Sequence, residues 1–216
     1  MAITKGTTSL DRGDAAANTI DCTAFNSVGV NAIVVGFSHE GAPVGETVSD
    51  NNSNGYSRVD LIDHTNTDMS VSMYVVFNPT TSSSHVITMT YDGGATRPFR
   101  NVGVWPVFGN FDTASQETQS SAQGNSTTID AGSLTTAGAS GLFTWLVNYN
   151  ARAVAPGSGW TEDQDNNGRE MESRLEPAGG TFDPSGTMSP NSDWVGIAVA
   201  LKEVIIYNAN LAWYKA

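Results

Sequence analysis

The chain has 216 residues, of which 39% are hydrophobic and 15% charged, and its formal net charge at pH 7 is −12. This composition is too apolar for a disordered chain, and an acidic surface repels phosphate backbones, so we expect a folded protein without a nucleic-acid partner. No apolar run approaches the roughly 20 residues needed to cross a bilayer, so we expect no membrane partner.

Residues 1–19 are small and polar, and we expect them to form an N-terminal arm that is either mobile or laid on a neighbouring subunit. Residues 1–6 lack the charged-then-apolar layout of a signal peptide. This predicts a protein that is made and kept in a host cytoplasm until export or lysis releases it. Cys22 is the single cysteine, so no intrachain disulfide is expected.

Strand-forming residues cluster between Gly-, Asn-, Ser- and Thr-rich turns, a pattern typical of an all-β protein. Residues 70–77 alternate, which indicates a strand with one apolar face, and residues 31–37 are nearly all apolar, as in a strand covered on both faces. Pro106 lies inside another apolar run and indicates an edge strand or a bulge. The strands predicted in the first half cover residues 20–25, 31–37, 56–62, 70–77, 86–91 and 101–111.

The second half begins with a weakly apolar stretch, residues 112–140, which we interpret as an extended crossing with weak strands rather than as a linker. Strands are then predicted over residues 142–149, 169–176 and 194–201, the second from its alternation despite its Glu and Arg content. The sequence therefore predicts a two-sheet jelly-roll β-sandwich over residues 20–203 in which both halves share one core. An N-terminal arm would precede it, and a C-terminal strand or tail, residues 204–216, would follow.

A six-residue pattern, D-x-x-x-N-G, occurs at residues 50–55 and again 113 positions later, at residues 163–168. Asn-Gly is a common hairpin signal, and this is the interpretation that we prefer. The pattern also matches the opening of a calcium loop, although Leu61 and Arg174 occupy the twelfth position, where an EF-hand needs Glu. A calcium-binding β-loop with a remote carboxylate, such as Asp60 or Glu172, remains an alternative. Its ligands would be Asp50, Asn52 and Asn54 in one loop and Asp163, Asp165 and Asn167 in the other.

No catalytic motif is found in the sequence. The three histidines, His39, His64 and His85, lie in or beside predicted loops, and no G-x-S-x-G, H-E-x-x-H or C-x-x-C motif accompanies them. A glycosidase pair of carboxylates is not excluded by counting, but the predicted central strands 70–77 and 194–201 contain no acid. We therefore expect a protein that is not an enzyme and that needs no cofactor other than the alternative Ca²⁺.

The C-terminal segment is unusually apolar for a terminus. Residues 204–216 follow a strand that already completes the predicted sandwich, and such side chains are not expected to stay in water. They either add a strand to their own sheet or dock on another copy of the chain, which predicts a homo-oligomer. The assembly residues would include Ile206, Leu211, Trp213 and Tyr214.

The order of motifs in the second half resembles a known family. Gly159-Trp160-Thr161, the Asn167-Gly168 turn, and Trp194 leading to Leu201-Lys202 are similar to a jelly-roll domain of tailed-phage and prophage structural proteins, found also in some bacterial surface proteins. The resemblance implies a virion protein, such as a capsid decoration or cement protein or a small tail-associated protein. It implies partners such as the major capsid protein, and no catalytic residues.

Two other functions fit the same residues. A carbohydrate-binding module would use exposed tryptophans, Trp160 and Trp194, as stacking platforms for a surface glycan, although packing in the core is their commoner role. An extracellular filament subunit would exchange its terminal strand with a neighbour.

Overall fold

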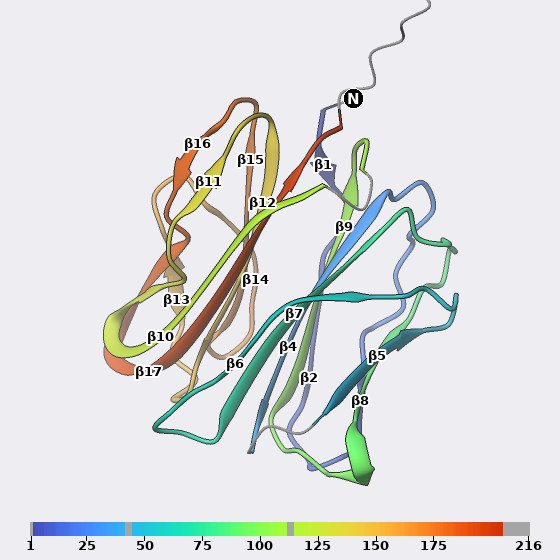
Figure 1. Cartoon of the computed structure of the whole chain (residues 1–216). Helices are drawn as coiled ribbons and strands as arrows, with labels where there is room; N and C mark the ends of the chain where they lie inside the picture. The colour runs from blue at the N-terminus through green and yellow to red at the C-terminus, as the bar shows by residue number, and fades with distance from the viewer. Residues whose placement is uncertain (1, 42–44, 112–114, 205–216) are drawn as a thin grey trace, which may run out of the picture.

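The computed structural model describes residues 2–41, 45–111 and 115–204, and it confirms the predicted all-β sandwich (Figure 1). Within these residues the one helical element is a short 3-10 turn, η1 (Asp92–Gly94). The strands of the first half are β1 (Thr4–Lys5), β2 (Ser9–Gly13), β3 (Thr19–Asp21), β4 (Ala32–Glu40), β5 (Glu46–Asp50), β6 (Ser57–Asp63), β7 (Met69–Phe77), β8 (Ile87–Tyr91) and β9 (Arg100–Phe108). Those of the second half are β10 (Gln116–Asp130), β11 (Leu134–Thr136), β12 (Ser140–Asn148), β13 (Val154–Pro156), β14 (Thr161–Asp165), β15 (Arg169–Glu176), β16 (Gly180–Phe182) and β17 (Ser185–Lys202).

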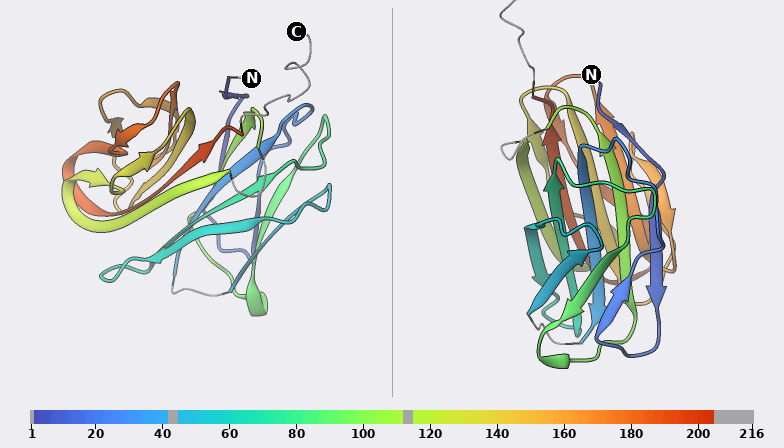
Figure 2. Two further views of the ribbon diagram at one scale, coloured as in Figure 1. Left: turned by 45° about the horizontal axis from the view of Figure 1, so that its top comes forward. Right: turned by 90° about the vertical axis from the view of Figure 1, so that its right-hand side faces the viewer.

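Two large antiparallel sheets pack face to face in the middle of the molecule. The first has the order β1-β9-β4-β7-β6, with β2 also paired to β9, and the second has the order β10-β17-β12-β15-β14, with β13 also paired to β17. Each large sheet comes from one half of the chain. Figure 2 shows the two halves side by side, the first in blue to green and the second in yellow to red.

Each half repeats the strand order of a jelly roll. In the first half, β2-β9-β4-β7 forms one layer and β3-β8-β5 forms the layer on its outer face. In the second half, β10-β17-β12-β15 repeats the first of these layers, and β11, β13 and β16 cover its outer face. An order in which the first strand pairs with the last is that of a double Greek key. The sandwich therefore contains this arrangement twice, back to back.

Three apolar cores separate the layers. The central core lies between the two large sheets and takes side chains from both halves, such as Val34 and Val75 from the first and Val147 and Val199 from the second. The two outer cores lie under the smaller sheets. Because both faces of the large sheets are covered, β4, β7, β9 and β12 are buried along nearly their whole length.

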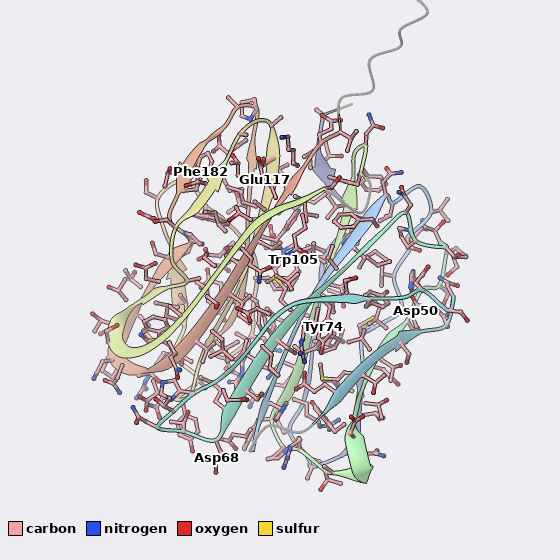
Figure 3. All side chains as sticks on the ribbon, viewed as in Figure 1. Asp50, Asp68, Tyr74, Trp105, Glu117 and Phe182 are labelled. Atoms are coloured by element: carbon pink, nitrogen blue, oxygen red, sulfur yellow. The ribbon has the colours of Figure 1, made fainter. Side chains whose placement is uncertain are left out.

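A tryptophan from one half fills a hollow in the sheet of the other. Gly36 on β4 and Gly103 on β9 are register partners, and a Cβ atom at either would lie 2.7 Å from the ring of Trp145 on β12. Trp145 also donates a hydrogen bond from Nε1 to the Phe37 carbonyl, at 3.2 Å. Its ring meets that of Trp105 edge to face, 6.2 Å between centroids, and Figure 3 shows Trp105 between the two halves. These contacts join the halves at the centre of the molecule.

The prediction of a mobile or neighbour-bound N-terminal arm is wrong. Strands β1 and β2 pair with β9 of the same chain, in registers such as Thr4 to Phe108 and Ser9 to Val104. They form the last strand of the first large sheet, which small polar residues can do because that edge lies at the surface.

Of the two interpretations of Pro106, the edge strand is wrong, whereas a bulge-type register shift is present, because Lys5 pairs with Val107 and Ser9 pairs with Val104. Pro106 lies in β9, which is flanked by β4 on one side and by β1 and β2 on the other. On the second side it falls in the gap between β1, which pairs with residues 107 and 108, and β2, which pairs with residues 100–104. An internal strand tolerates proline here because no ladder bond to its missing N–H is needed on that side.

The two D-x-x-x-N-G turns are not equivalent in the fold. The first joins β5 to β6, whereas the second joins β14 to β15. The strand orders equate β6 with β14, whereas a shift of 113 residues carries Ile62 of the edge strand β6 onto Leu175 of β15, the neighbour of the edge strand β14. The halves are related by topology, but not by the 113-residue offset.

Candidate functional site

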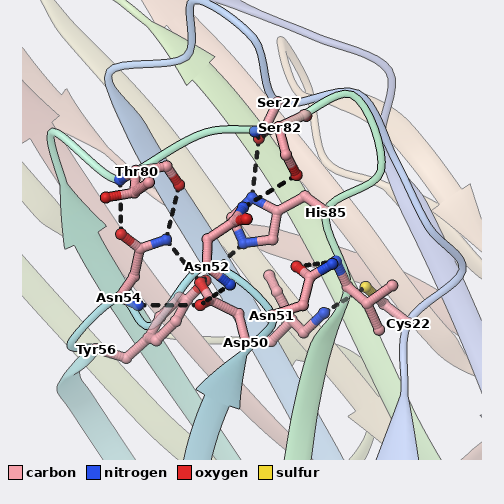
Figure 4. Close-up of polar contacts among 12 residues, drawn as sticks. Cys22, Ser27, Asp50, Asn51, Asn52, Asn54, Tyr56, Thr80, Ser82 and His85 are labelled. Atoms are coloured by element: carbon pink, nitrogen blue, oxygen red, sulfur yellow. Dashed lines mark hydrogen bonds and ion pairs between the residues drawn. The ribbon is translucent and has the colours of Figure 1, made fainter.

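The first D-x-x-x-N-G turn is anchored by a buried histidine. His85 Nε2 lies 2.8 Å from Asp50 Oδ2, and His85 Nδ1 lies 2.9 Å from Ser27 Oγ (Figure 4). The side chains of His85 and Asp50 are both fully buried. Phe25 stacks on the imidazole, with 5.0 Å between ring centroids and 8° between planes.

A serine, a histidine and an aspartate in this order suggest a nucleophile, its base and the group that orients the base. Ser27 is, however, completely buried, and its hydroxyl is already used by the neighbouring loop. It accepts a hydrogen bond from the Ser82 backbone N–H at 2.9 Å and lies 3.1 Å from the Ser82 carbonyl. No substrate carbonyl can reach Oγ in this arrangement. The hydrogen bonds of Ser27, Asp50 and His85 instead connect the loops that follow β3, β5 and β7.

The predicted cation ligands of this turn bind protein groups instead. Asp50 accepts hydrogen bonds from the Asn52 and Asn54 backbone N–H groups at 2.9 and 3.0 Å, and from the Asn54 amide and the Tyr56 hydroxyl at 2.7 and 2.9 Å. Burial opposes ionisation of Asp50, but these donors and His85 outweigh it, and its pKa is lowered. Asn54 Oδ1 accepts the Thr80 N–H at 2.6 Å. The Asp50 carboxylate is therefore saturated by internal donors, which favours the hairpin interpretation over the calcium alternative of Asp50, Asn52 and Asn54.

A second buried histidine–carboxylate contact holds the other end of β5. His39 Nε2 lies 3.0 Å from Glu46 Oε1, and Ser72 donates a hydrogen bond to Glu46 Oε2 at 2.9 Å. Glu46 and Asp50 are the first and last residues of β5 and share its inner face. Both ends of this short edge strand are thus fixed to the first large sheet or its loops.

The second predicted cation loop is split by a β-bulge. The register between β14 and β15 shifts between Glu162 and Gln164, at the position of Asp163. Asp163 turns toward the central core, where Trp105 Nε1 donates to Oδ2 at 2.8 Å and Lys5 forms an ion pair with Oδ1. Asp165 pairs in register with Glu170, and the side chains of these two residues share the outer face of the sheet, opposite to the face on which Asp163 lies.

Asp163 and Asp165 therefore lie on opposite faces of the sheet, which favours the hairpin interpretation over the calcium alternative of Asp163, Asp165 and Asn167. Across residues 2–41, 45–111 and 115–204, no group of three or more His, Cys, Asp or Glu side chains is placed to hold a metal ion.

An unexpected pair of carboxyl groups lies on the outer face of the second large sheet. Glu170 and Glu172 are completely buried, two residues apart on β15. Among the described residues, no donor outside the pair reaches their four carboxyl oxygens, and the hydroxyl of Thr144, the register partner of Glu172, also has no partner. Burial raises the pKa of Glu170, and the adjacent Glu172 raises it further. Burial also raises the pKa of Glu172, so the site favours the protonated acids.

The two tryptophans proposed as sugar platforms are part of the third core. Trp160 and Trp194 are each 7% exposed, and both pack in the cluster that includes Leu142 and Ala198. Their Nε1 groups donate to the Asp183 carbonyl at 2.9 Å and to Ser126 Oγ at 3.0 Å. Neither ring face is free for a glycan, so the platform prediction is wrong and the commoner packing role holds.

A surface pocket lies in front of the His85 contacts. It has a volume of about 460 Å³ and is formed by residues 6–9, by the loop of residues 23–28 and by Phe108. Its wall includes Phe25, the ring that stacks on His85. Asp11 ties the two sides together, because it accepts hydrogen bonds from the Ser9 hydroxyl at 2.7 Å and from the Thr23 N–H and hydroxyl at 2.7 and 2.5 Å.

The predicted assembly residues Ile206, Leu211, Trp213 and Tyr214 lie outside the described residues. The described chain contains no helix with the length and apolar character of a membrane span. No family model, curated protein or solved structure matches this sequence. The similarity to phage structural proteins therefore rests on sequence motifs alone.

Proposed function

We propose that this chain is a non-enzymatic structural protein of a virion, either a capsid decoration protein or a small tail-associated protein. The strand order carries the proposal: two jelly-roll arrangements share one central core. Jelly rolls recur in viral capsid proteins and in lectins, where a rigid sandwich presents loops and edges to a partner. The motif resemblance of the second half points in the same direction.

The chemistry-bearing side chains support a structural role because they are used inside the fold. His85 and His39 hold the two ends of β5, and His64 Nε2 lies 3.3 Å from the Gly124 carbonyl of the other half. All three imidazoles are buried. Groups fixed in this way add rigidity to the assembly unit.

The proposed partners are further copies of this chain and the major capsid protein. The residues from 205 onward carry Ile206, Leu211, Trp213 and Tyr214, and they follow Val204, whose N–H donates to the Asn110 carbonyl at one end of the molecule. Burying three such side chains on a neighbour would stabilise an oligomer by about 5 kcal/mol before the entropy of ordering is subtracted.

Deleting residues 205–216 tests the assembly part. We expect the intact protein to sediment as a homo-oligomer and the truncated protein to sediment as a monomer, with an unchanged far-UV circular dichroism spectrum. If the truncated protein remains an oligomer, residues 205–216 do not form the contact. If the intact protein is a monomer at high micromolar concentration, the proposed self-assembly is contradicted.

Binding to preformed capsids tests the function itself. The genes that neighbour this one should encode capsid or tail proteins, and particles assembled from the neighbouring capsid protein should bind the purified chain in a salt-resistant, saturable manner. Neighbouring genes unrelated to virions, together with an absence of binding, would overturn the proposal.

A further inference from the structure

We propose that the pocket between residues 6–9 and the loop of residues 23–28 is a binding site for a neutral saccharide. Its volume of about 460 Å³ lies in the range of small-ligand sites, roughly 300–1,000 Å³. The site uses neither of the buried tryptophans, and it goes beyond the proposed virion role without depending on it.

The lining of the pocket is polar but uncharged. No Asp, Glu, Lys, Arg or His lines it, although the chain as a whole has a net charge of −12. Its polar groups are the hydroxyls of Thr7, Thr8, Ser9 and Thr23 and the amide of Asn26. Hydroxyls and amides both donate and accept hydrogen bonds, as the hydroxyls of a sugar do. Asp11, beside the lining, already accepts hydrogen bonds from Ser9 and Thr23, and a negatively charged ligand would find no countercharge among the lining residues.

Two of these groups are available to a ligand, and one of them, the Asn26 amide, is also oriented. Asn26 Oδ1 accepts the Val28 N–H at 3.0 Å, which fixes the amide plane and leaves Nδ2 to donate elsewhere. Within the described part of the chain, neither Asn26 Nδ2 nor Thr7 Oγ1 has a hydrogen-bond partner, and both residues are exposed. A ligand hydroxyl can therefore bind them without displacing an internal bond.

The apolar part of the pocket suits the C–H face of a sugar ring. Phe25, Val28 and Phe108 contribute to the lining, and Phe25 is held from behind by its stack on His85. His85 is fixed in turn by Asp50 and Ser27. A rigid aromatic wall needs no ordering when the ligand arrives, which favours binding. The buried contacts of His85 thus hold the Phe25 ring in place in the pocket wall.

Binding of an array of neutral and sialylated oligosaccharides to the intact protein tests the site, followed by saturation-transfer NMR with the best neutral sugar. We expect saturable binding of neutral sugars over sialylated ones. Asn26→Ala and Thr7→Val should each weaken it about tenfold, the loss of roughly one buried hydrogen bond. The matched control is Asn150→Ala, an exposed asparagine of the second half, which should bind as the parent does.

Thermal unfolding of each variant shows whether the fold is intact, since both substitutions are at exposed side chains. If no neutral sugar binds, the proposal is overturned. It is equally overturned if a sugar binds and folded Asn26→Ala and Thr7→Val variants bind it like the control, because the ligand then lies elsewhere.

Discussion

At the scale of single residues, buried carboxyl groups occur in two opposite environments, one rich in hydrogen-bond donors and one without them. Asp50 is buried but receives five hydrogen bonds from protein donors and His85, and its pKa is lowered. Glu170 and Glu172 are buried without such donors, and burial raises the pKa of both. The first arrangement stabilises a charged group, whereas the second penalises one.

The glutamate pair predicts a protein that loses stability as the pH rises. An acid with a higher pKa in the folded than in the unfolded protein binds more protons when folded, so the free energy of unfolding falls as the pH rises above the ordinary glutamate value of 4.5. Glu172→Gln should remove much of this loss and be more stable than the parent at pH 8. Urea unfolding at pH 5 and pH 8 measures the difference. Asp68→Asn, an exposed carboxylate of the first half, should leave the slope unchanged, and a parent more stable at pH 8 than at pH 5 would contradict the prediction.

Removing the histidine of the first turn should be costly. His85→Ala leaves a buried carboxylate oxygen of Asp50 and the Ser27 hydroxyl short of a partner, and we expect a loss of about 2–3 kcal/mol in the free energy of unfolding. Chemical denaturation measures it. Ser83→Ala, in the same loop but exposed, serves as the control, and equal stabilities of the two variants would show that the contact is not structural.

At the scale of elements, the two halves are joined by side chains that fit into the opposing sheet. Gly36→Ala would place a Cβ atom 2.7 Å from the Trp145 ring, and we expect it to destabilise the protein by about 1–3 kcal/mol through overpacking. Gly138→Ala is the control, because a Cβ atom there meets nothing within 4 Å. A shift of the urea midpoint for Gly36→Ala alone is expected. Two equal midpoints would show that Trp145 does not fill this hollow.

Much of the secondary structure could be predicted from the sequence, because alternation and apolar runs report directly which faces are buried. The strand at residues 169–176 was identified by alternation against its helical composition, and it is β15. Short strands such as β5 and β13 were missed because they carry few apolar side chains. The spacing of Glu46 and Asp50 could have indicated β5, because residues i and i+4 of a strand lie on the same face and both carboxylates here face inward.

The candidate sites were harder to predict than the strands. The pairing of Ser27, Asp50 and His85 depends on three loops brought together by the sheet order, which no local pattern contains. The bulge at Asp163 reverses one side chain and so separates two carboxylates that the motif placed together. Likewise, whether Trp160 faced a ligand or the core depended on a third apolar layer that the sequence did not reveal.

At the scale of the whole molecule, the two halves share a central core that neither can complete alone. The large sheets bury opposite sides of that core, with Trp105 and Trp145 between them. A half separated from its partner would expose a broad apolar face, which folded monomers avoid. Intact protein should accordingly resist cleavage into two stable halves between residues 112 and 140.

The most direct test of this shared core is equilibrium unfolding of the intact protein beside two fragments, residues 1–113 and 114–216. The intact chain should unfold in one transition that is the same by tryptophan fluorescence and by far-UV circular dichroism. Each fragment alone should be unfolded or aggregated, and mixing the two should restore β-structure. Fragments that fold separately as stable monomers, or two distinct transitions in the intact chain, would contradict a shared core.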